Sequence, residues 1–206
     1  MNNSTIDINT YFDKIFYINL ARDQDRNKYM LKQFEELGIT NFERVEGVIY
    51  DTIPEKKLWR NFIKTDTRYI LSSLGCRDSH LKAIKVSKER NYKQVLILED
   101  DIYFTTTPEE LFRIGSWNSN WNMLYFGGLV EAQYRNQIVG AYAYGVKDLV
   151  FDDIINMGIS SGMEIDNFYA KIIQHMSYNP TGVYNIDIVR PFNTVQVNYN
   201  FKSNIR

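Results

Sequence analysis

The sequence is poor in the features that mark secreted, membrane-spanning and polyanion-binding proteins. Its 206 residues include one cysteine, Cys76, which excludes an internal disulfide and suits a reducing compartment. No apolar stretch approaches the roughly 20 residues of a membrane span, and the first residues, MNNSTIDINTYFDK, lack the basic start and apolar core of a signal peptide. The formal net charge is −1 without a Lys/Arg block, which disfavours nucleic-acid binding. We therefore expect a cytoplasmic protein without an integral membrane segment.

The chain also lacks a long Pro-, Gly- or Ser-rich linker, an internal repeat and a low-complexity block. Residues 1–206 are therefore predicted to form a single domain. A hydrophobic content of 44% and an aromatic content of 15% supply enough large side chains for a buried core. Frequent Asn, Ile, Lys and Tyr suggest a coding bias toward A and T, as in a low-GC bacterium or a large DNA virus.

The first part of the chain is predicted to form a strand, a helix and a second strand. Residues 14–20, KIFYINL, are apolar nearly throughout, which is typical of a buried parallel strand. Apolar residues recur at helical spacing in residues 21–39, and Gly38 stands where that helix would end. Residues 39–45, ITNFERV, are predicted to form the second strand, which ends at an acidic turn.

The middle of the chain repeats the helix-strand pattern. Residues 50–71 are irregular and rich in charges and aromatic rings, so we expect a surface segment with short helical pieces, of a size that often covers a ligand. Residues 72–92 are predicted to be helical, with Ser72 or Ser73 as the cap. Residues 94–98, QVLIL, form another continuous apolar strand. This alternation predicts an α/β fold with a mostly parallel central sheet flanked by helices.

The second half of the chain is expected to add shorter elements and a polar tail that folds back over the domain. Predicted helices are residues 108–114 (PEELFRI), 147–158 (KDLVFDDIINMG) and 164–176 (EIDNFYAKIIQHM), predicted strands are residues 122–128 (NMLYFGG), 139–146 (VGAYAYGV) and 183–189 (VYNIDIV), and the tail is residues 190–206.

Three adjacent carboxylates, those of Glu99, Asp100 and Asp101, follow the strand QVLIL. In an open α/β sheet, ligands bind beyond the carboxyl ends of the strands. Adjacent carboxylates raise each other's pKa unless a cation or hydrogen-bond donors compensate. Carboxylate oxygens suit Mg²⁺ or Mn²⁺, which also bind substrate phosphates. A metal-diphosphate site and a plain solvated acidic turn are both consistent with this segment.

A second candidate segment is SLGCRDSH, residues 73–80, which we place at the start of a helix. Backbone amides at a helix N-terminus favour an anion, and Gly75 permits close approach of a ligand to the backbone. Ser79 and His80 are candidate hydrogen-bonding residues. The alternative is a capped helix in which His80 has local partners.

A third candidate is INLARDQDR, residues 18–26, at the end of the first strand. A turn carrying Arg22 and Arg26 can hold a nucleotide, with either guanidinium near phosphate. Alternatively, Arg26 and Asp23 merely decorate the start of a helix. The turn lacks the GxGxxG and GxxxxGK[ST] fingerprints, which disfavours a typical dehydrogenase or P-loop NTPase.

Taken in order, these segments resemble glycosyltransferase family 25, which contains lipooligosaccharide and collagen hydroxylysine galactosyltransferases. The resemblance rests on INLARDQDR, FERVEG, SLGCRDSHLKAI and VLILEDDI, and extends through GAYAYGVKD, GMEIDNFY and VQVNYNFKSNI over nearly the whole chain. It implies a GT-A, Rossmann-like fold, a UDP-sugar donor, dependence on Mn²⁺ or Mg²⁺, and inverting transfer.

The resemblance also implies roles for particular residues. Glu99 to Asp101 match the family's DxD motif, with Asp101 as the metal ligand and Asp100 or Glu99 nearer the ribose or sugar of the donor. The expected donor-binding residues are Asn19, Leu20, Arg22, Glu46, Gly75, Ser79, His80, Glu99 and Asp100.

Asp166 falls where an inverting enzyme of this type would carry its general base. Such a transfer needs a carboxylate to take the proton of the acceptor hydroxyl, while a metal ion stabilises the departing diphosphate. Glu164 lies two residues away, and either acid can instead cap a helix. Many GT-A enzymes use a histidine near the C-terminus as a further metal ligand, but His80 and His175 lie outside the final stretch.

The sequence thus predicts a hexosyltransferase that uses UDP-galactose or UDP-glucose and a glycan or hydroxylysine-bearing acceptor. Two other classes stay open: a metal-dependent phosphohydrolase that uses the same acidic turn, and a non-catalytic glycan-binding module. Gln196 and Ser203 of the tail are candidate contacts for donor or acceptor, and a structural role is equally open for both.

Overall fold

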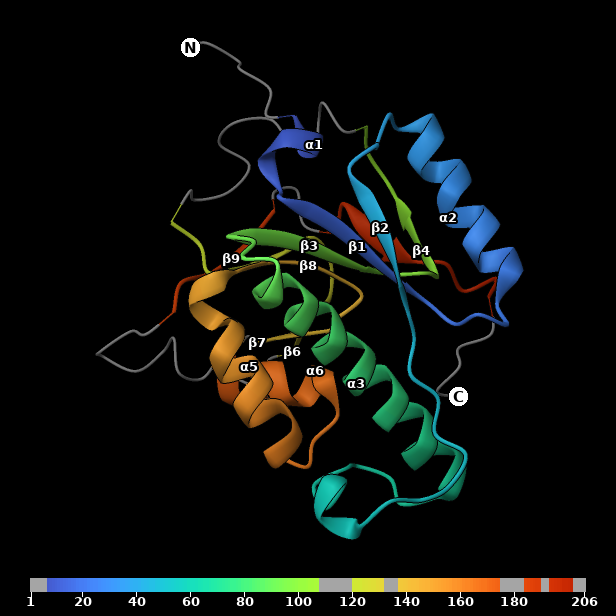
Figure 1. Ribbon diagram of the computed structural model, residues 1–206, viewed down its shortest axis with the longest axis vertical. Coiled ribbons are helices and arrows are strands. Elements are labelled where there is room, and N and C mark those ends of the chain that lie inside the picture. The colour runs from blue at the N-terminus through green and yellow to red at the C-terminus, as the bar shows by residue number, and fades with distance from the viewer. Residues whose placement is uncertain (1–6, 108–119, 132–136, 175–183, 190–192, 202–206) are drawn as a thin grey trace.

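The computed structural model describes residues 7–107, 120–131, 137–174, 184–189 and 193–201. Within them lies a six-stranded sheet in the order β2-β1-β3-β8-β5-β9 (Figure 1). The strands are β1 (Lys14–Asn19), β2 (Phe42–Glu46), β3 (Gln94–Glu99), β5 (Met123–Tyr125), β8 (Ala143–Lys147) and β9 (Ile186–Ile188). β1 is parallel to β2 and β3, β5 is parallel to β9, and β8 is antiparallel to β3 and β5. The predicted α/β class with a mostly parallel central sheet is confirmed.

Helices cover both faces of this sheet, which explains why its central strands are apolar along their whole length. Phe16 of β1 packs with α3 (Thr67–Glu89), α5 (Asp148–Ser160) and α6 (Ile165–Phe168). Its neighbours Ile15 and Tyr17 point to the opposite face, where α1 (Ile8–Tyr11) and α2 (Gln24–Glu36) pack. Figure 1 shows α2 on one side of the sheet and α3, α5 and α6 on the other. Alternate residues of one strand therefore belong to two separate hydrophobic cores.

α3 begins earlier than the sequence predicted. Asp66 is its N-cap and accepts a hydrogen bond of 2.9 Å from the backbone N–H of Tyr69. The prediction that Ser72 or Ser73 caps this helix is wrong, because both lie inside it. The first turns were missed because their apolar residue Ile70 packs against Phe62 in a small separate cluster, so the pattern does not continue that of the main core. Consequently the segment SLGCRDSH lies in the helix interior.

Several short elements differ in extent or type from the sequence prediction. η1 (Lys56–Leu58) is the helical piece of the predicted surface segment. α6 continues directly into η3 (Tyr169–Ile173), a π-helix, where the sequence predicted one uninterrupted helix. The second strand spans Phe42–Glu46 instead of residues 39–45, so Glu46 belongs to the strand. The helix predicted for residues 108–114 lies outside the described residues.

Two small antiparallel sheets were not predicted. β4 (Ile102–Phe104) pairs with β10 (Val195–Val197), and β6 (Leu129–Glu131) pairs with β7 (Gln137–Val139). The strand predicted for residues 139–146 is divided between β7 and β8. Through β10, the predicted return of the tail to the domain is confirmed for residues 193–201. No helix in the described part of the chain has the length and apolar character needed to cross a membrane.

The parallel pairing brings the carboxyl ends of three strands to the same edge of the sheet. In register, Asn19 at the end of β1 pairs with Glu46 of β2, and Ile18 pairs with Glu99 of β3. Residues that follow β1 and β3 are therefore neighbours, although they are about eighty positions apart: Asn19 and Asp100 are separated by 81. This edge is where ligands of α/β sheets bind.

Candidate active site

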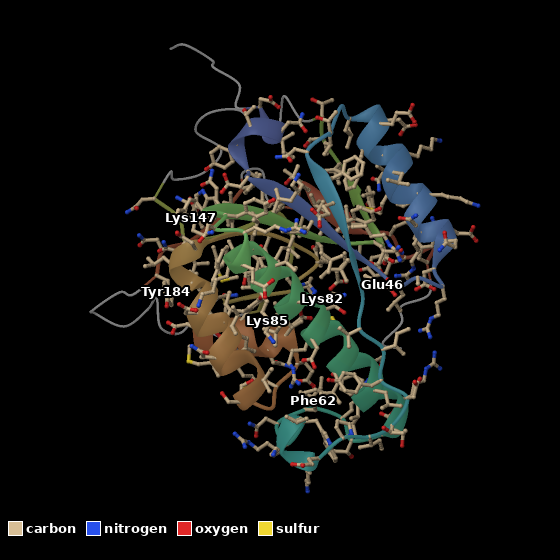
Figure 2. All side chains as sticks on the ribbon, in the orientation of Figure 1. Glu46, Phe62, Lys82, Lys85, Lys147 and Tyr184 are labelled. Carbon is tan, nitrogen blue, oxygen red and sulfur yellow. The ribbon has the colours of Figure 1, made fainter. Side chains whose placement is uncertain are left out.

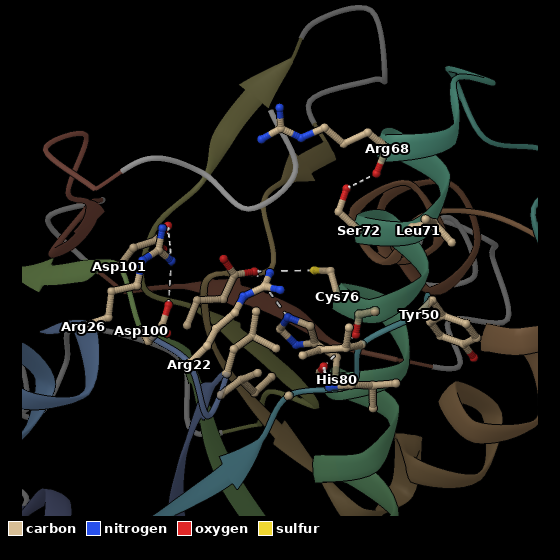
Figure 3. A pocket seen from close by; sticks show the side chains of 18 of the residues that line it. Arg22, Arg26, Tyr50, Arg68, Leu71, Ser72, Cys76, His80, Asp100 and Asp101 are labelled. Atoms are coloured by element: carbon tan, nitrogen blue, oxygen red, sulfur yellow. Dashed lines mark hydrogen bonds and ion pairs between the residues drawn. The ribbon is translucent and has the colours of Figure 1, made fainter. Parts of the chain in front are cut away.

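A cavity of about 540 Å³ opens beyond the carboxyl ends of β1 and β3, bounded by α3 and the loop that follows β2 (Figure 3). Its walls carry three arginines and four carboxylates, a mixture suited to a ligand that holds both anionic and cationic groups. The lining residues are Ile18, Leu20, Arg22, Arg26, Gly47, Val48, Ile49, Tyr50, Asp51, Thr67, Arg68, Leu71, Ser72, Gly75, Cys76, Ser79, His80, Glu99, Asp100 and Asp101.

Asp100 is held by two donors from the β1–α2 region. Its Oδ2 accepts a hydrogen bond of 2.6 Å from Asn19 Nδ2, and its Oδ1 accepts one of 2.8 Å from Arg26 Nη1. Burial raises the pKa of Asp100, and both hydrogen bonds oppose that rise. Asn19 is itself oriented, since its Oδ1 accepts a hydrogen bond of 2.9 Å from Arg44 Nε. Asp100 is therefore fixed in place. Asn19 does not line the cavity itself but orients Asp100, which does.

Asp101 presents a carboxylate oxygen that the described residues leave unsatisfied. Its Oδ2 lies 3.3 Å from Arg26 Nη1, whereas Oδ1 is buried without a hydrogen-bond partner among them. Burial, and then the charge of Glu99, raise the pKa of Asp101 to about 7. A buried oxygen without a partner is costly unless a ligand satisfies it. A carboxylate oxygen beside a cavity is the donor type that a hard divalent cation binds, so this residue fits the metal role that the family resemblance implies.

Arg26 is committed to the acidic turn. Its side chain is buried between Asp100 and Asp101, and its guanidinium lies 5.4 Å from the ring centre of Phe201. Burial lowers its pKa, but the hydrogen bond to Asp100 and the charges of the nearby aspartates together outweigh that effect and raise the pKa. Arg22 lines the same cavity with a side chain that is 61% exposed. Of the two arginines proposed to approach phosphate, Arg22 is the one placed to reach an incoming ligand.

Glu99 faces two side chains of α3. Its Oε1 lies 3.3 Å from His80 Nε2 and 3.9 Å from Cys76 Sγ. Burial, together with the charge of Asp100, raises the pKa of Glu99 to about 7. His80 is buried, and burial lowers its pKa to about 4, so its ring is neutral at neutral pH. Its Nδ1 lies 3.1 Å from the hydroxyl of Tyr144, which gives both ring nitrogens a partner.

Gly75 and Ser79 position the loop after β2 against α3. Ser79 Oγ donates a hydrogen bond of 2.6 Å to the Gly75 carbonyl and accepts one of 2.8 Å from the Val48 N–H. A Cβ on Gly75 would lie 2.5 Å from the Val48 carbonyl oxygen, so only glycine permits this approach. The expectation of an anion site at a helix N-terminus is wrong, because amides inside a helix bond to the helix itself. Both residues nevertheless line the cavity.

Of the two other expected donor-side residues, Leu20 and Glu46, only the first lines the cavity. Glu46 is exposed, and its carbonyl accepts a hydrogen bond of 2.8 Å from Lys82 Nζ, which lies beside it in Figure 2. Gly47, the next residue, lines the cavity instead. The loop after β2 thus reaches the site one residue later than expected.

Asp166 and Glu164 differ in their environments. Burial, and then the charge of Glu99, raise the pKa of Asp166 to about 6, and the backbone N–H of Ala141 donates to it. Asp166 is half-buried near the cavity but does not line it. Glu164 is buried and accepts hydrogen bonds from the Ile63 N–H at 2.7 Å and the Tyr69 hydroxyl at 3.0 Å.

Glu164 therefore ties the surface segment to α6, and its side chain makes no capping bond to that helix. Burial raises the pKa of Asp166, which lies within electrostatic reach of Glu99 in the acidic turn. The contacts of Glu164 are structural, so Asp166 stays the candidate for the general base.

Several lining residues were missed from the sequence. Arg68 extends from the first turn of α3 (Figure 3), and Tyr50 lies on the loop after β2; both line the cavity. The Tyr50 hydroxyl donates a hydrogen bond of 2.5 Å to Asp78 Oδ2, which anchors the loop to α3. The only sequence signal for these two residues was the expectation that residues 50–71 cover a ligand. Arg68 could not be placed because the start of its helix was predicted wrongly.

Comparison with known protein families agrees with the motifs. The family described as glycosyltransferase family 25 (LPS biosynthesis protein) matches residues 12–178. A protein of Drosophila melanogaster named glycosyltransferase 25 family member is 28% identical over 127 residues, which is 56% of this chain and 21% of that protein. Procollagen galactosyltransferase 2 of Mus musculus is 29% identical over 130 residues, again 56% of this chain and 21% of that protein.

Among solved structures, the chain is similar to a glycosyltransferase involved in the glycosylation of the major capsid of PBCV-1. The TM-score is 0.45 and the sequence identity 11%, with 86% of this chain and 94% of that chain covered. The match spans only about a fifth of the length of each of these curated relatives, which are much longer than this chain.

Proposed function

Since the chain belongs to glycosyltransferase family 25, we propose that it is a GT-A-type inverting hexosyltransferase. It transfers galactose, or alternatively glucose, from a UDP-sugar to a hydroxyl group of a glycan or of a hydroxylysine-bearing acceptor. The observation that carries this proposal is the buried, unpartnered Oδ1 of Asp101 beside an arginine-bearing cavity at the carboxyl edge of the sheet. The name procollagen galactosyltransferase, borne by several relatives, favours galactose.

The donor diphosphate lies near the acidic turn in this proposal. Asp101 would hold Mn²⁺ or Mg²⁺, which when bound neutralises the phosphates and stabilises the departing diphosphate. Arg22 and Arg68, which both line the cavity, supply positive charge to the same group. Arg26 and Asn19 keep Asp100 in place, so that Asp100 and Glu99 face the hydroxyl groups of the ribose or sugar.

The remaining walls suit the other parts of a nucleotide sugar. Leu20, Val48 and Tyr50 offer apolar and aromatic surface on the side of β1 and the following loop. Residues 49–51 of this loop line the cavity and can supply backbone amide and carbonyl groups to a base, as small-molecule sites commonly do. A volume of about 540 Å³ lies within the range of such sites.

Asp166 is the proposed general base. A carboxylate with a pKa of about 6 is ionised at neutral pH and is a stronger base than an ordinary aspartate. Its carboxylate accepts the proton of the acceptor hydroxyl while that oxygen attacks the anomeric carbon. The Ala141 N–H that donates to Asp166 orients the carboxylate for this transfer.

A transfer assay with matched variants tests the proposal. Purified protein is incubated with UDP-galactose or UDP-glucose and Mn²⁺, and sugar release to water or to a hydroxyl acceptor is followed. Asp166→Asn is expected to bind UDP normally while losing turnover, and Asp101→Ala to lose Mn²⁺-dependent UDP binding measured by calorimetry. Asp152→Asn, an exposed acid on α5, serves as the control and keeps both properties.

Four results would contradict parts of this proposal. Ordinary turnover by Asp166→Asn removes the assigned base, and unchanged Mn²⁺-dependent affinity in Asp101→Ala removes the assigned metal ligand. Release of inorganic phosphate without sugar transfer identifies a metal-dependent phosphohydrolase. Donor binding without turnover across a broad acceptor panel identifies a non-catalytic glycan-binding module.

A further inference from the structure

The side chains of Cys76, His80 and Glu99 converge at the floor of the cavity. Cys76 and His80 are four residues apart on α3, so they lie one above the other on the same helix face. Figure 3 shows Cys76 and His80 on this helix, and Glu99 reaches them from the end of β3. The proposed sugar transfer uses neither the thiol nor the imidazole for chemistry. A sulfur, a nitrogen and an oxygen atom thus meet at one point that a solute in the cavity can reach.

The spacing of these three atoms matches that of cation ligands. Glu99 Oε1 lies 3.3 Å from His80 Nε2 and 3.9 Å from Cys76 Sγ, and all three atoms are within 4.8 Å of one another. Tetrahedral Zn²⁺ with bonds of about 2.0 to 2.3 Å separates its ligand atoms by roughly 3.3 to 3.5 Å. The nitrogen-oxygen distance already has this value. The sulfur-oxygen distance of 3.9 Å needs a small rotation of the Glu99 side chain, which is 30% exposed and therefore has room to turn.

The imidazole of His80 is oriented by groups behind it. Its Nδ1 lies 3.1 Å from the Tyr144 hydroxyl, which in turn lies 2.9 Å from the Tyr169 hydroxyl. The His80 and Tyr144 rings are stacked with centres 5.7 Å apart, so the imidazole cannot rotate freely. A hydrogen on Nδ1 that faces Tyr144 leaves the lone pair of Nε2 directed at Glu99. Metal-binding histidines commonly have such a supporting partner on the second ring nitrogen.

The charges of the cluster suit a divalent cation. A thiolate and a carboxylate offset two positive charges, and His80 adds a neutral ligand, so the occupied cluster has no net charge. Burial keeps the Cys76 thiol protonated in the free protein by raising its pKa well above the usual value, and the charges of Glu99 and Asp166 act in the same direction. Zn²⁺ deprotonates a coordinating thiol outright. A hard cation gains little from sulfur, which distinguishes this cluster from Asp101.

We propose that Cys76, His80 and Glu99 form a second cation site, specific for a thiophilic divalent ion such as Zn²⁺, whose fourth coordination position opens into the cavity. The site is separate from the hard-cation position at Asp101, although both border the same cavity. An ion bound there would draw in the Glu99 carboxylate and leave an open coordination position facing the cavity. The inference stands on the geometry of three side chains and does not require the proposed sugar transfer.

Cobalt spectroscopy of the full chain tests this site directly. Co²⁺ replaces Zn²⁺ in tetrahedral sites, and a thiolate ligand gives a charge-transfer band in the near ultraviolet. We expect this band when metal-stripped protein is titrated with Co²⁺, with displacement by Zn²⁺. In Cys76→Ser the band is absent and the Zn²⁺ affinity, measured against a chromogenic chelator, falls by about tenfold or more. Asp101→Asn is the matched control that keeps the cobalt band.

A stability measurement separates loss of the site from loss of the fold. Zn²⁺ is expected to raise the melting temperature of the wild-type protein but not that of Cys76→Ser, whose melting temperature without metal stays close to the wild-type value. Absence of a charge-transfer band in the wild type overturns the proposal. Unchanged Zn²⁺ affinity in Cys76→Ser does so as well, as does loss of the cobalt band in Asp101→Asn, which would place the ion at the acidic turn. None of these readouts involves sugar transfer.

Discussion

Arg26 on α2 donates a hydrogen bond of 2.8 Å to Asp100, 74 residues later in the chain, and the same Nη1 atom lies 3.3 Å from Asp101. One guanidinium group therefore serves two of the three adjacent carboxylates after β3. In the free protein this arginine supplies the positive charge that the turn requires. The divalent cation proposed at Asp101 would share that carboxylate with Arg26, so the two cations would compete for it.

This competition predicts the effect of Arg26→Met. The substitution preserves much of the side-chain volume but leaves buried carboxylates without their cation, and we expect a loss of about 3 kcal/mol of unfolding free energy. Added Mn²⁺ should restore more stability to this variant than to the wild type, because the ion no longer competes with a guanidinium. Urea unfolding with and without Mn²⁺ measures both effects. Arg22→Met, which alters an exposed side chain, is the control and should change stability little.

Gly75→Ala tests the close approach between α3 and the loop after β2. A Cβ placed 2.5 Å from the Val48 carbonyl oxygen forces the loop outward, at a cost of about 1 to 3 kcal/mol that exceeds the helical preference for alanine. Because that loop lines the cavity, UDP affinity should also fall. Gly158→Ala is the matched control, since its Cβ would meet only the flexible end of Leu81. Equal UDP affinity in both variants would show that the loop does not bind the donor.

Glu164→Gln tests the structural assignment of this acid. The change removes charge from a carboxylate that accepts from the Ile63 N–H, the Tyr69 hydroxyl and Asn167 Nδ2. We expect a loss of about 1 to 3 kcal/mol in stability, with residual activity in the folded fraction. Asp166→Asn should have the opposite effects: its stability should be nearly normal, and its turnover should be lost. A Glu164→Gln variant that is stable but inactive would reverse the two roles.

The carboxylates of Glu99 and Asp101 predict a pH dependence of stability. Burial raises the pKa of each to about 7 from ordinary values of 4.5 and 3.8, so between these limits the folded chain holds protons that the unfolded chain has lost. Without divalent cation, stability should therefore fall as the pH rises from about 4 to 7. The stabilisation by Mn²⁺ should increase over the same window, because the cation requires an ionised carboxylate. Thermal melts of wild type and Asp101→Asn across this range measure both trends.

The central sheet could be predicted because local chemistry determines it. KIFYINL and QVLIL are apolar on both faces, which only strands buried between two helical layers tolerate, and they form β1 and β3. By contrast, β4 and β10 are three-residue strands whose pairing depends on a partner far away in the chain. The start of α3 was missed although Asp66 is a good capping residue, because its first turns pack outside the main core.

For the candidate site, the sequence placed Asp100 and Asp101 correctly at the end of a buried strand, since that position follows from the strand itself. It could not pair Arg26 with them, because a contact over 74 residues leaves no local pattern. The role of Gly75 could not be predicted either. The sequence suggested that this glycine leaves space for a ligand, whereas the backbone of Val48 occupies that space.

The pairing of β4 with β10 has a consequence for the order of events during synthesis. Tyr103 of β4 donates a hydrogen bond of 2.8 Å to Gln196 of β10, 93 residues later, and the Asn198 N–H donates to the Asp101 carbonyl. Chains emerge from the ribosome N-terminus first. A nascent chain can therefore assemble β1, β2 and β3 early, while the acidic turn stays without its backing strand until residue 198 has emerged. Ribosome-bound chains that stop short of β10 should hold the sheet but lack a finished acidic turn.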